Sequence, residues 1–339
     1  MLRLPANRSF PVPEVDYGRE RSILNASPRQ YPTTSHGRTM QEPNLKGLIA
    51  ATFTPTTAER EFAPDAVPSY VEFLLQRGVQ GLFVCGSSGE FASFTVEERC
   101  AIAEAFLHAV DGRVPVLVHV GHNCLADARR LATHAATLGA AGIAFSPPNF
   151  FKPACLDAAV ECCAHIANAV PDTPCFYYHI PDRTGVSFDM KRFLAVAVDE
   201  IPAFAGVKYT HQALDEYLLC RQTFPDTNMV FGADEMLLCA LAAGATCAIG
   251  TTYNHLAPLY TRLWSAFREG DLETARQCQC RSVRFIRTLK TYGGLAAMKT
   301  AMTFFGMDCG PPRLPLRPLS EAERAALQQS LRHQECTGL

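Results

Sequence analysis

Lys208 is the residue of this chain whose type and position best suit a catalytic role. It stands near the end of an otherwise apolar run, 203–209, and the other five of the six lysines fall in stretches typical of helices, loops or edges. Burial in such a run disfavours the charged ammonium. A neutral amine can attack a carbonyl carbon and form a Schiff base, whose protonated imine is an electron sink for cleaving the adjacent carbon–carbon bond. The alternative is a lysine that reaches solvent from the strand end or pairs with a carboxylate.

Two further features fit this chemistry. Tyr178 lies in a second apolar run, and its phenol could shuttle the proton of a substrate hydroxyl, although most tyrosines in strands only pack in a core. Ser87 and Ser88 lie between two glycines and could present hydroxyls and backbone N–H groups to a carboxylate. Alone, a serine pair between glycines indicates a turn. The three features together favour the Schiff-base interpretation.

The elements that must position these residues repeat along the chain. Short runs rich in β-branched and aromatic residues alternate with amphipathic stretches such as 95–110, where Thr95 and Glu98 form a capping box, and 123–138. We expect strands at 47–54, 79–85, 114–120, 142–146, 174–180, 203–209, 228–232 and 246–250. Near-continuous apolar strands of this kind are typical of parallel sheets covered on both faces.

Eight such units in about 210 residues predict an α/β fold, a closed (β/α)8 TIM barrel. The chain of 339 residues is long enough for one such barrel, which typically needs about 250 residues. An open doubly wound sheet is the alternative, but the glycine-rich phosphate turn expected after its first strand is missing. Active sites of such barrels lie at the carboxyl ends of the strands, and Lys208, Tyr178 and the serine pair all stand at predicted strand ends. We divide the chain into a disordered tail (1–43), the barrel (44–256) and a C-terminal extension of helices only (257–339).

Composition narrows the class of protein. The net charge of −2 gives no reason to expect nucleic acid or an anionic membrane as partner, and no apolar run reaches the roughly 20 residues that span a bilayer. Among the fourteen cysteines, Cys85, Cys175, Cys239 and Cys247 lie in apolar runs, as buried thiols do. Without a CxxC pair or an apolar signal segment, we expect a reduced, cytoplasmic protein. The arginine- and serine-rich tail could instead be a transit peptide, or Met40 an alternative start.

From about Leu45 to Leu319 the chain resembles the superfamily of dihydrodipicolinate synthases and N-acetylneuraminate lyases. GSSGE (86–90) stands at that family's GxxGE motif, YYHIP (177–181) at its catalytic tyrosine and GVKYT (206–210) at its Schiff-base lysine. The resemblance implies that Lys208 forms the imine, that Tyr178 is the acid–base residue, and that Ser87 and Ser88 bind the pyruvyl carboxylate. It also implies a homotetramer.

Several motifs look like the sialic acid lyases of this superfamily in particular: HVG (119–121), YYHIP, GADE (232–235), TTYN (251–254) and GPPRLPL (310–316). By this resemblance the hydroxyl-rich arm of the sugar acid would be held by Thr210, Gly232, Asp234, Glu235 and Thr251. Adjacent carboxylates at a barrel mouth are good acceptors for sugar hydroxyls, and the alternative is a solvated carboxylate pair on a loop. The implied reaction cleaves N-acetylneuraminate to pyruvate and N-acetyl-D-mannosamine.

Arg183 departs from this pattern. It stands where dihydrodipicolinate synthases carry an arginine for a substrate carboxylate and where sialic acid lyases usually have an apolar residue. It could therefore bind a second carboxylate, or it could pair with Asp182 or a neighbouring subunit. The synthases also borrow a tyrosine from a neighbouring subunit, in the loop after the fourth strand, and here that loop (147–153) contains phenylalanines but no tyrosine.

His119 and His122 suggest a metal-dependent aldolase, but no carboxylate is evident at ligand spacing, so we expect no metal. No cofactor is needed, because the lysine itself supplies the electron sink. The expected partners are small molecules, a sialic acid and pyruvate. Two rivals stay open: an aldolase, dehydratase or synthase acting on another 2-keto acid, and a catalytically silent barrel that serves as a binding or scaffold protein.

Overall fold

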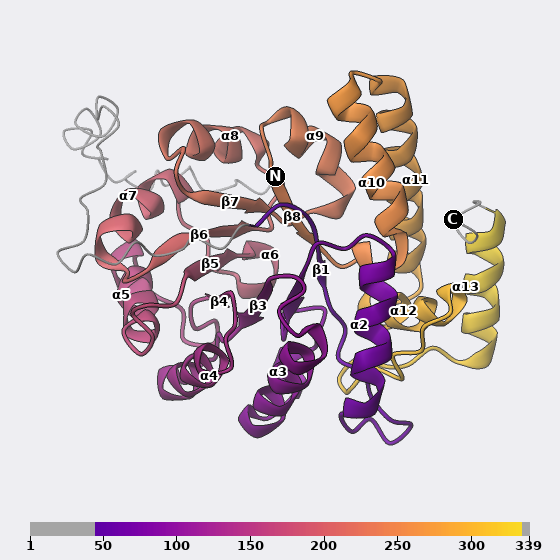
Figure 1. Cartoon of the computed structure of the whole chain (residues 1–339), viewed down its shortest axis with the longest axis horizontal. Coiled ribbons are helices and arrows are strands. Elements are labelled where there is room, and N and C mark those ends of the chain that lie inside the picture. The colour runs from indigo at the N-terminus through magenta and orange to yellow at the C-terminus, as the bar shows by residue number, and fades with distance from the viewer. Residues whose placement is uncertain (1–44, 334–339) are drawn as a thin grey trace, which may run out of the picture. The chain divides into compact units, whose positions relative to one another are not determined.

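The structure, a computed structural model, describes residues 45–333. The predicted tail at 1–43 lies outside the described residues. Eight parallel strands close into a barrel in chain order, with β8 pairing with β1 (Figure 1), so the predicted TIM barrel is confirmed. The strands are β1 (Gly47–Ala51), β2 (Gly81–Val84), β3 (Val116–His119), β4 (Gly142–Phe145), β5 (Cys175–His179), β6 (Phe204–Tyr209), β7 (Asn228–Phe231) and β8 (Cys247–Gly250). Each lies inside its predicted run.

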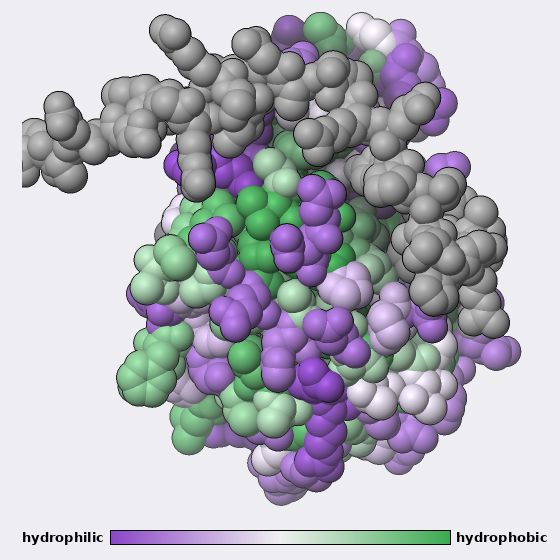
Figure 2. Space-filling view, turned by 90° about the vertical axis from the view of Figure 1, so that its left-hand side faces the viewer, coloured by the Kyte–Doolittle hydropathy of each residue, from purple (hydrophilic) through white to green (hydrophobic). Residues whose placement is uncertain are grey.

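Helices alternate with the strands and surround them (Figure 1). Helix α3 begins directly after Thr95, the first residue of the predicted capping box, in which Thr95 accepts from the Glu98 backbone N–H and Glu98 accepts from the Thr95 backbone N–H. The helices around the barrel are α2 (Val67–Gln76), α3 (Val96–Val110), α4 (Leu125–Thr137), α5 (Leu156–Ala167), α6 (Pro181–Thr184), α7 (Met190–Glu200), α8 (Leu214–Thr223), α9 (Leu237–Ala242) and α10 (Tyr253–Glu269). On the face formed around α5, α7 and α8, hydrophilic residues are spread among smaller hydrophobic areas (Figure 2).

The apolar residues form two separate clusters. One fills the barrel interior with alternate strand residues such as Ile49, Phe83, Leu117, Phe176 and Tyr178. The other lies between the strands and the helices. Because successive strand residues point to opposite faces, membership of the inner cluster shows which side chains face the barrel axis. Tyr178 therefore points into the barrel.

The C-terminal extension contains α11 (Leu272–Thr291), α12 (Leu295–Ala301) and α13 (Glu321–His333). Helix α11 lies beside α10, and α12 and α13 pack against α11 (Figure 1). The predicted division at 256/257 falls at a kink in α10, where Leu256 has non-helical dihedral angles two residues before Pro258. The prediction of helices only is wrong for 306–320, which contains no helix. Four prolines in this segment lack the N–H that a helix requires.

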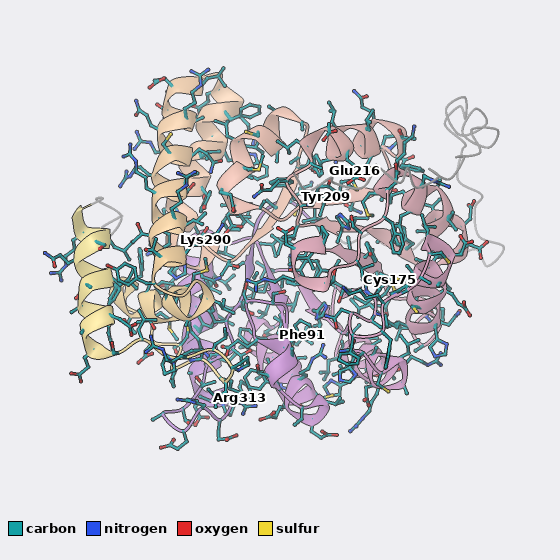
Figure 3. All side chains as sticks on the ribbon, turned by 180° about the vertical axis from the view of Figure 1, so that it is seen from behind. Phe91, Cys175, Tyr209, Glu216, Lys290 and Arg313 are labelled. Atoms are coloured by element: carbon teal, nitrogen blue, oxygen red, sulfur yellow. The ribbon has the colours of Figure 1, made fainter. Side chains whose placement is uncertain are left out.

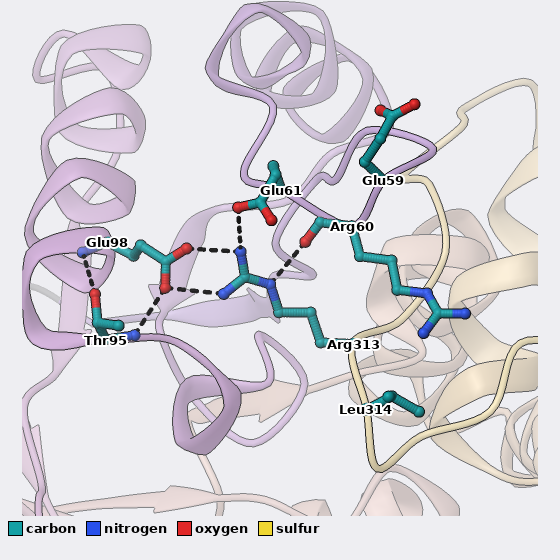
Figure 4. Close-up of a pocket in the computed structure, with 7 residues that line it drawn as sticks. All are labelled: Glu59, Arg60, Glu61, Thr95, Glu98, Arg313 and Leu314. Carbon is teal, nitrogen blue, oxygen red and sulfur yellow. Dashed lines mark hydrogen bonds and ion pairs between the residues drawn. The ribbon is translucent and has the colours of Figure 1, made fainter.

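A cluster of charged side chains joins this proline-rich segment to the barrel (Figure 4). The guanidinium of Arg313 donates to both carboxylate oxygens of Glu98, at 2.6 and 2.8 Å, and to Glu61 at 3.1 Å. Glu98 thus serves both the cap of α3 and the extension. The surrounding pocket, of about 410 Å3, is lined by none of the predicted site residues.

The cysteines are only partly where the sequence suggested. Cys85, Cys175 and Cys247 are buried, but Cys239 is exposed on α9, so its expected burial is wrong. Its apolar neighbours Leu238 and Ala240 belong to a short helix whose residue 239 faces outward. All thirteen cysteines of the described part of the chain are free thiols. No helix of residues 45–333 is both long and apolar enough to cross a membrane.

Candidate active site

Lys208 faces the barrel interior because of an irregularity in strand pairing. Cys175 pairs with Phe204 but Phe176 pairs with Gly206, so Ala205 is an extra residue in β6. Ala205 belongs to the interior cluster while Val207 belongs to the outer one, so the side-chain alternation changes sense between them. Bulges of this kind re-aim side chains and are common next to active sites. Lys208 consequently points inward, directly beside Tyr178 on β5.

The amine of Lys208 lies in an aromatic setting. Its Nζ is 3.6 Å from the ring centre of Tyr178 and 4.9 Å from that of Phe83, and it donates to Thr210 Oγ1 at 3.0 Å. The side chain is 3% exposed. Burial lowers the pKa of Lys208, with the Tyr178 phenol and Asp234 acting in the opposite direction. The environment therefore favours the neutral, nucleophilic amine, and the alternative of a lysine that reaches solvent is excluded.

The glycine-flanked serines follow β2 at the same end of the barrel. Ser87 Oγ lies 3.4 Å from the phenol oxygen of Tyr178, which is long for a hydrogen bond between hydroxyls but places the two groups side by side. Ser88 Oγ lies 2.6 Å from Thr251 Oγ1. The structure thus brings both serines to the group that contains Lys208, with Ser88 reaching the loop after β8.

Glu90, the last residue of the GSSGE motif, forms a buried ion pair that the sequence analysis missed. Its carboxylate accepts from Lys299 Nζ at 2.9 Å and from the Arg313 backbone N–H at 2.7 Å, and the two paired side chains are 1% and 0% exposed. Lys299 is thus a second fully buried lysine. Unlike Lys208, it has a carboxylate partner, so only Lys208 is suited to nucleophilic attack. The partners are 209 residues apart, and no local pattern signals the pairing.

Asp234 is buried beyond the end of β7. Its Oδ2 accepts from the backbone N–H and the hydroxyl of Thr252, at 2.7 and 2.6 Å. Burial raises the pKa of Asp234 to about 6, and the two bonds from Thr252 oppose this. A Cβ on Gly250 would lie 2.1 Å from Asp234 Oδ1, so glycine is needed at 250 for the carboxylate to fit. Asp234 is thus bound to the loop after β8, and its charge also acts on Lys208.

The other residues expected to bind the hydroxyl-rich arm of the sugar acid also lie at the carboxyl ends of the strands. Thr210 follows β6 and touches Gly232, where a Cβ would lie 2.0 Å from Thr210 Oγ1. Glu235 pairs with Lys290 of α11 at 3.0 Å, and the Glu235 side chain is 26% exposed (Lys290 is labelled in Figure 3). The carboxylate of Glu235 therefore already has a partner in the C-terminal extension. Thr251 is half-buried, bound to Ser88.

Arg183 lies on α6, directly after β5, and is exposed. Within residues 45–333 its side chain forms no ion pair, so the alternative of a pairing with Asp182 is not found in the single chain. The two residues are neighbours on one helical turn, a spacing at which side chains do not face each other. Among the interpretations given for Arg183, contact with a substrate or with another subunit stays open.

The two histidines considered as metal ligands are separated. His119 is buried in the barrel, whereas His122 is half-exposed, with its Nδ1 accepting from the Cys124 backbone N–H at 3.0 Å. Contrary to the expectation that no carboxylate stands at ligand spacing, Asp127 Oδ2 lies 3.7 Å from His122 Nδ1. The ligand atoms of His122, Cys124 and Asp127 lie within 4.8 Å of one another at the start of α4. None of these three belongs to the group around Lys208.

Comparison with known proteins gives a consistent result. The model of the dihydrodipicolinate synthetase family matches residues 44–334. N-acetylneuraminate lyase A of Xenopus laevis is 41% identical over 276 residues, covering 80% of this chain and 90% of that protein. The N-acetylneuraminate lyase of Mus musculus is 37% identical over 294 residues, covering 85% and 92%.

Solved structures agree with these relatives. The N-acetylneuraminate lyase of Proteus mirabilis superposes with a TM-score of 0.83 at 37% identity, over 86% of this chain and 98% of that one. The enzyme of Aliivibrio salmonicida gives a TM-score of 0.84 at 36% identity, over 87% and 98%. On the extent of the family match and the identity to these relatives, the chain belongs to the dihydrodipicolinate synthetase family.

Proposed function

We propose that this protein is a class I aldolase that cleaves N-acetylneuraminate reversibly to pyruvate and N-acetyl-D-mannosamine. The observation that carries the proposal is the buried amine of Lys208, 3.6 Å from the ring of Tyr178, in a chain 37–41% identical to N-acetylneuraminate lyases. Family membership supports the reaction class, and the identity of these relatives supports the substrate.

The reaction begins when Lys208 Nζ attacks the ketone carbon of the open-chain sugar acid and water leaves, which gives a protonated imine. Tyr178, with help from Ser88 or the substrate carboxylate, takes the proton of the hydroxyl on the carbon beyond the breaking bond. The bonding electrons move into the imine, so an aldehyde departs and an enamine remains on Lys208. Protonation of the enamine carbon and hydrolysis release pyruvate and restore the amine.

Binding is assigned to the groups around the amine. Ser87 and Ser88 hold the pyruvyl carboxylate with hydroxyls and backbone N–H groups. The hydroxyl-rich arm is held by Thr210, Gly232, Asp234, Glu235 and Thr251. Support comes from their common position at the carboxyl ends of the strands, where barrels of this type bind substrates.

A second candidate is a related aldolase, dehydratase or synthase acting on another 2-keto acid. The observation that favours it is Arg183, an exposed cation without a carboxylate partner in the described chain, directly after the strand that carries Tyr178. A guanidinium binds carboxylates in a bidentate manner, so it could recognise a second acidic group on a different substrate.

We further propose a cytoplasmic homotetramer. Phe150 and Phe151, in the loop after β4, are 77% and 84% exposed, and association would cover aromatic surface of this kind. Light scattering on the purified chain measures the mass directly. A monomer at micromolar concentration would contradict this part of the proposal.

The function is tested by pyruvate release from N-acetylneuraminate, coupled to lactate dehydrogenase, with Lys208→Ala as the control. We expect release by the wild type and none by the variant. Turnover of 2-keto-3-deoxygluconate is measured in parallel. Preference for that compound would contradict N-acetylneuraminate as the substrate. Pyruvate release by Lys208→Ala equal to that of the wild type would contradict the Schiff-base mechanism.

A further inference from the structure

His119, the last residue of β3, is buried in the barrel interior beside the reacting groups, yet no step of the aldol cleavage uses it. It is 1% exposed. Its ring packs edge-to-face against Tyr178, with ring centres 5.6 Å apart, and lies 4.5 Å from the ring centre of Phe91. Because the ring is shielded from solvent, the role of His119 must lie in its contacts with neighbouring residues.

The ring also makes one directed bond. Nδ1 lies 3.1 Å from the carbonyl oxygen of Cys85. A carbonyl oxygen can only accept, so Nδ1 carries the hydrogen. Cys85 has a φ of 56°, which is left-handed, and it is followed directly by Gly86, Ser87 and Ser88. The bond from His119 therefore fixes the backbone at the point where the loop with the two serines (86–89), called the serine loop below, leaves β2.

The position of His119 is itself fixed by a buried cation. Arg99 of α3, 1% exposed, donates from Nη2 to the His119 carbonyl at 2.7 Å and from Nη1 to the Gly121 carbonyl at 3.1 Å. Burial, together with the charges of Arg99 and Lys208, lowers the pKa of His119 well below its usual value. The imidazole stays neutral near Lys208 and keeps its single Nδ1 hydrogen for Cys85.

We propose that His119 is a positioning residue for the aldolase, which holds the serine loop through the Cys85 carbonyl and the side chain of Tyr178 through contact between the two rings. The two contacts couple the group that binds the pyruvyl carboxylate to the group that moves the proton. This inference rests on the proposed Schiff-base function but not on the identity of the sugar acid.

Two substitutions separate the two contacts. His119→Asn places an amide N–H where Nδ1 stands, so it keeps the bond to Cys85 and loses the ring. His119→Phe keeps the ring and loses the bond. Nε2 has no hydrogen-bond partner among residues 45–333, so His119→Phe removes no other bond to the described chain. His119→Gln carries its amide one bond farther from the backbone and serves as a second variant without the bond.

Two quantities are measured for each variant. The first is the pyruvate concentration that gives half-maximal adduct after borohydride reduction, read by mass spectrometry of the whole protein, which requires no sugar. For His119→Phe and His119→Gln we expect this midpoint to rise about three- to tenfold, as for loss of one hydrogen bond between neutral groups, and for His119→Asn to stay within about twofold.

The second quantity is kcat for pyruvate release from N-acetylneuraminate. We expect His119→Asn to lower it about tenfold to a hundredfold, because small misplacement of a reacting group has effects of that size, and His119→Phe to change it less than about threefold. The proposal thus predicts opposite effects of the two variants: His119→Phe changes the pyruvate affinity, and His119→Asn changes the turnover.

His255 provides the matched control. It is also buried, donates from Nε2 to the Met298 carbonyl at 2.7 Å, and packs against the rings of Phe53 and Phe285, outside the group around Lys208. We expect His255→Phe to lower the melting temperature without changing the pyruvate midpoint by more than about twofold.

Parallel changes of midpoint and kcat in His119→Asn and His119→Phe would overturn the proposal, and so would an unchanged midpoint in both variants that lack the bond. If the wild type traps pyruvate but releases none from N-acetylneuraminate, the sugar assignment fails while the pyruvate midpoints still decide the role of His119 in the serine loop.

Discussion

The Glu90–Lys299 ion pair joins the end of the serine loop to the C-terminal extension, and Lys299→Met removes one of its two charges. Both side chains are inaccessible, at 1% and 0% exposure, and the two charged atoms lie 2.9 Å apart. Lys299 also donates to Thr56 Oγ1 at 3.3 Å and to Pro311 O at 3.1 Å. The variant would leave the carboxylate of Glu90 with the Arg313 backbone N–H as a remaining donor.

Breaking a buried pair by removing one partner costs about 3–5 kcal/mol, because the other charge stays buried without compensation. Since folded proteins are stable by only about 5–15 kcal/mol, we expect Lys299→Met to unfold at a much lower urea concentration than the wild type. The double variant Glu90→Gln with Lys299→Met contains no uncompensated charge, and we expect it to recover about 1–2 kcal/mol of the loss.

Urea unfolding followed by circular dichroism, at one fixed protomer concentration, measures these differences. Lys290→Met is the matched control, since Lys290 pairs with Glu235 at a similar distance of 3.0 Å but is 59% exposed. An exposed pair contributes about 0–1 kcal/mol. If Lys299→Met cost no more than Lys290→Met, the reasoning from burial would be refuted.

Three other substitutions test the site. Tyr178→Phe should lower kcat for pyruvate release about 10²- to 10⁴-fold while pyruvate still forms a borohydride-trapped adduct; near-normal kcat would contradict its acid–base role. Burial raises the pKa of Asp234 to about 6, above roughly 4 in an unfolded chain, so the folded state holds that proton more tightly between these values. Wild-type stability should therefore fall relative to Asp234→Asn as the pH rises from about 4 to 6, and parallel urea midpoints would contradict this. Gly250→Ala should cost about 1–3 kcal/mol in urea unfolding, because its Cβ would lie 2.1 Å from Asp234 Oδ1; an unchanged midpoint would mean that the carboxylate moves freely.

The barrel and the position of Lys208 near a strand end could be predicted because they depend on local patterns. All eight predicted runs contain a strand, since buried parallel strands are apolar over their whole length. The direction in which Lys208 points could not be derived by alternation alone. It depends on the extra residue Ala205 in β6, which arises from pairing with β5 rather than from the composition of the strand.

Contacts between segments far apart in the chain could not be predicted from local sequence patterns. The ion pair of Lys299 could not be predicted, because its partner, Glu90, is 209 residues away and no local pattern joins the two. The position of His119 in the barrel interior follows from its spacing of two residues from Leu117, once a barrel is assumed, and this makes a role as metal ligand the less suitable interpretation. The non-helical segment at 306–320 is predictable from its four prolines, three of which also belong to the GPPRLPL motif.

The central claim is that Lys208 carries the Schiff base. The most direct test is to reduce the protein with borohydride in the presence of pyruvate, digest it, and locate the modified residue by mass spectrometry. The account predicts one stable pyruvate adduct, on the peptide that contains Lys208, and none in Lys208→Ala. An adduct on another of the six lysines, or no adduct in the wild type, would contradict it.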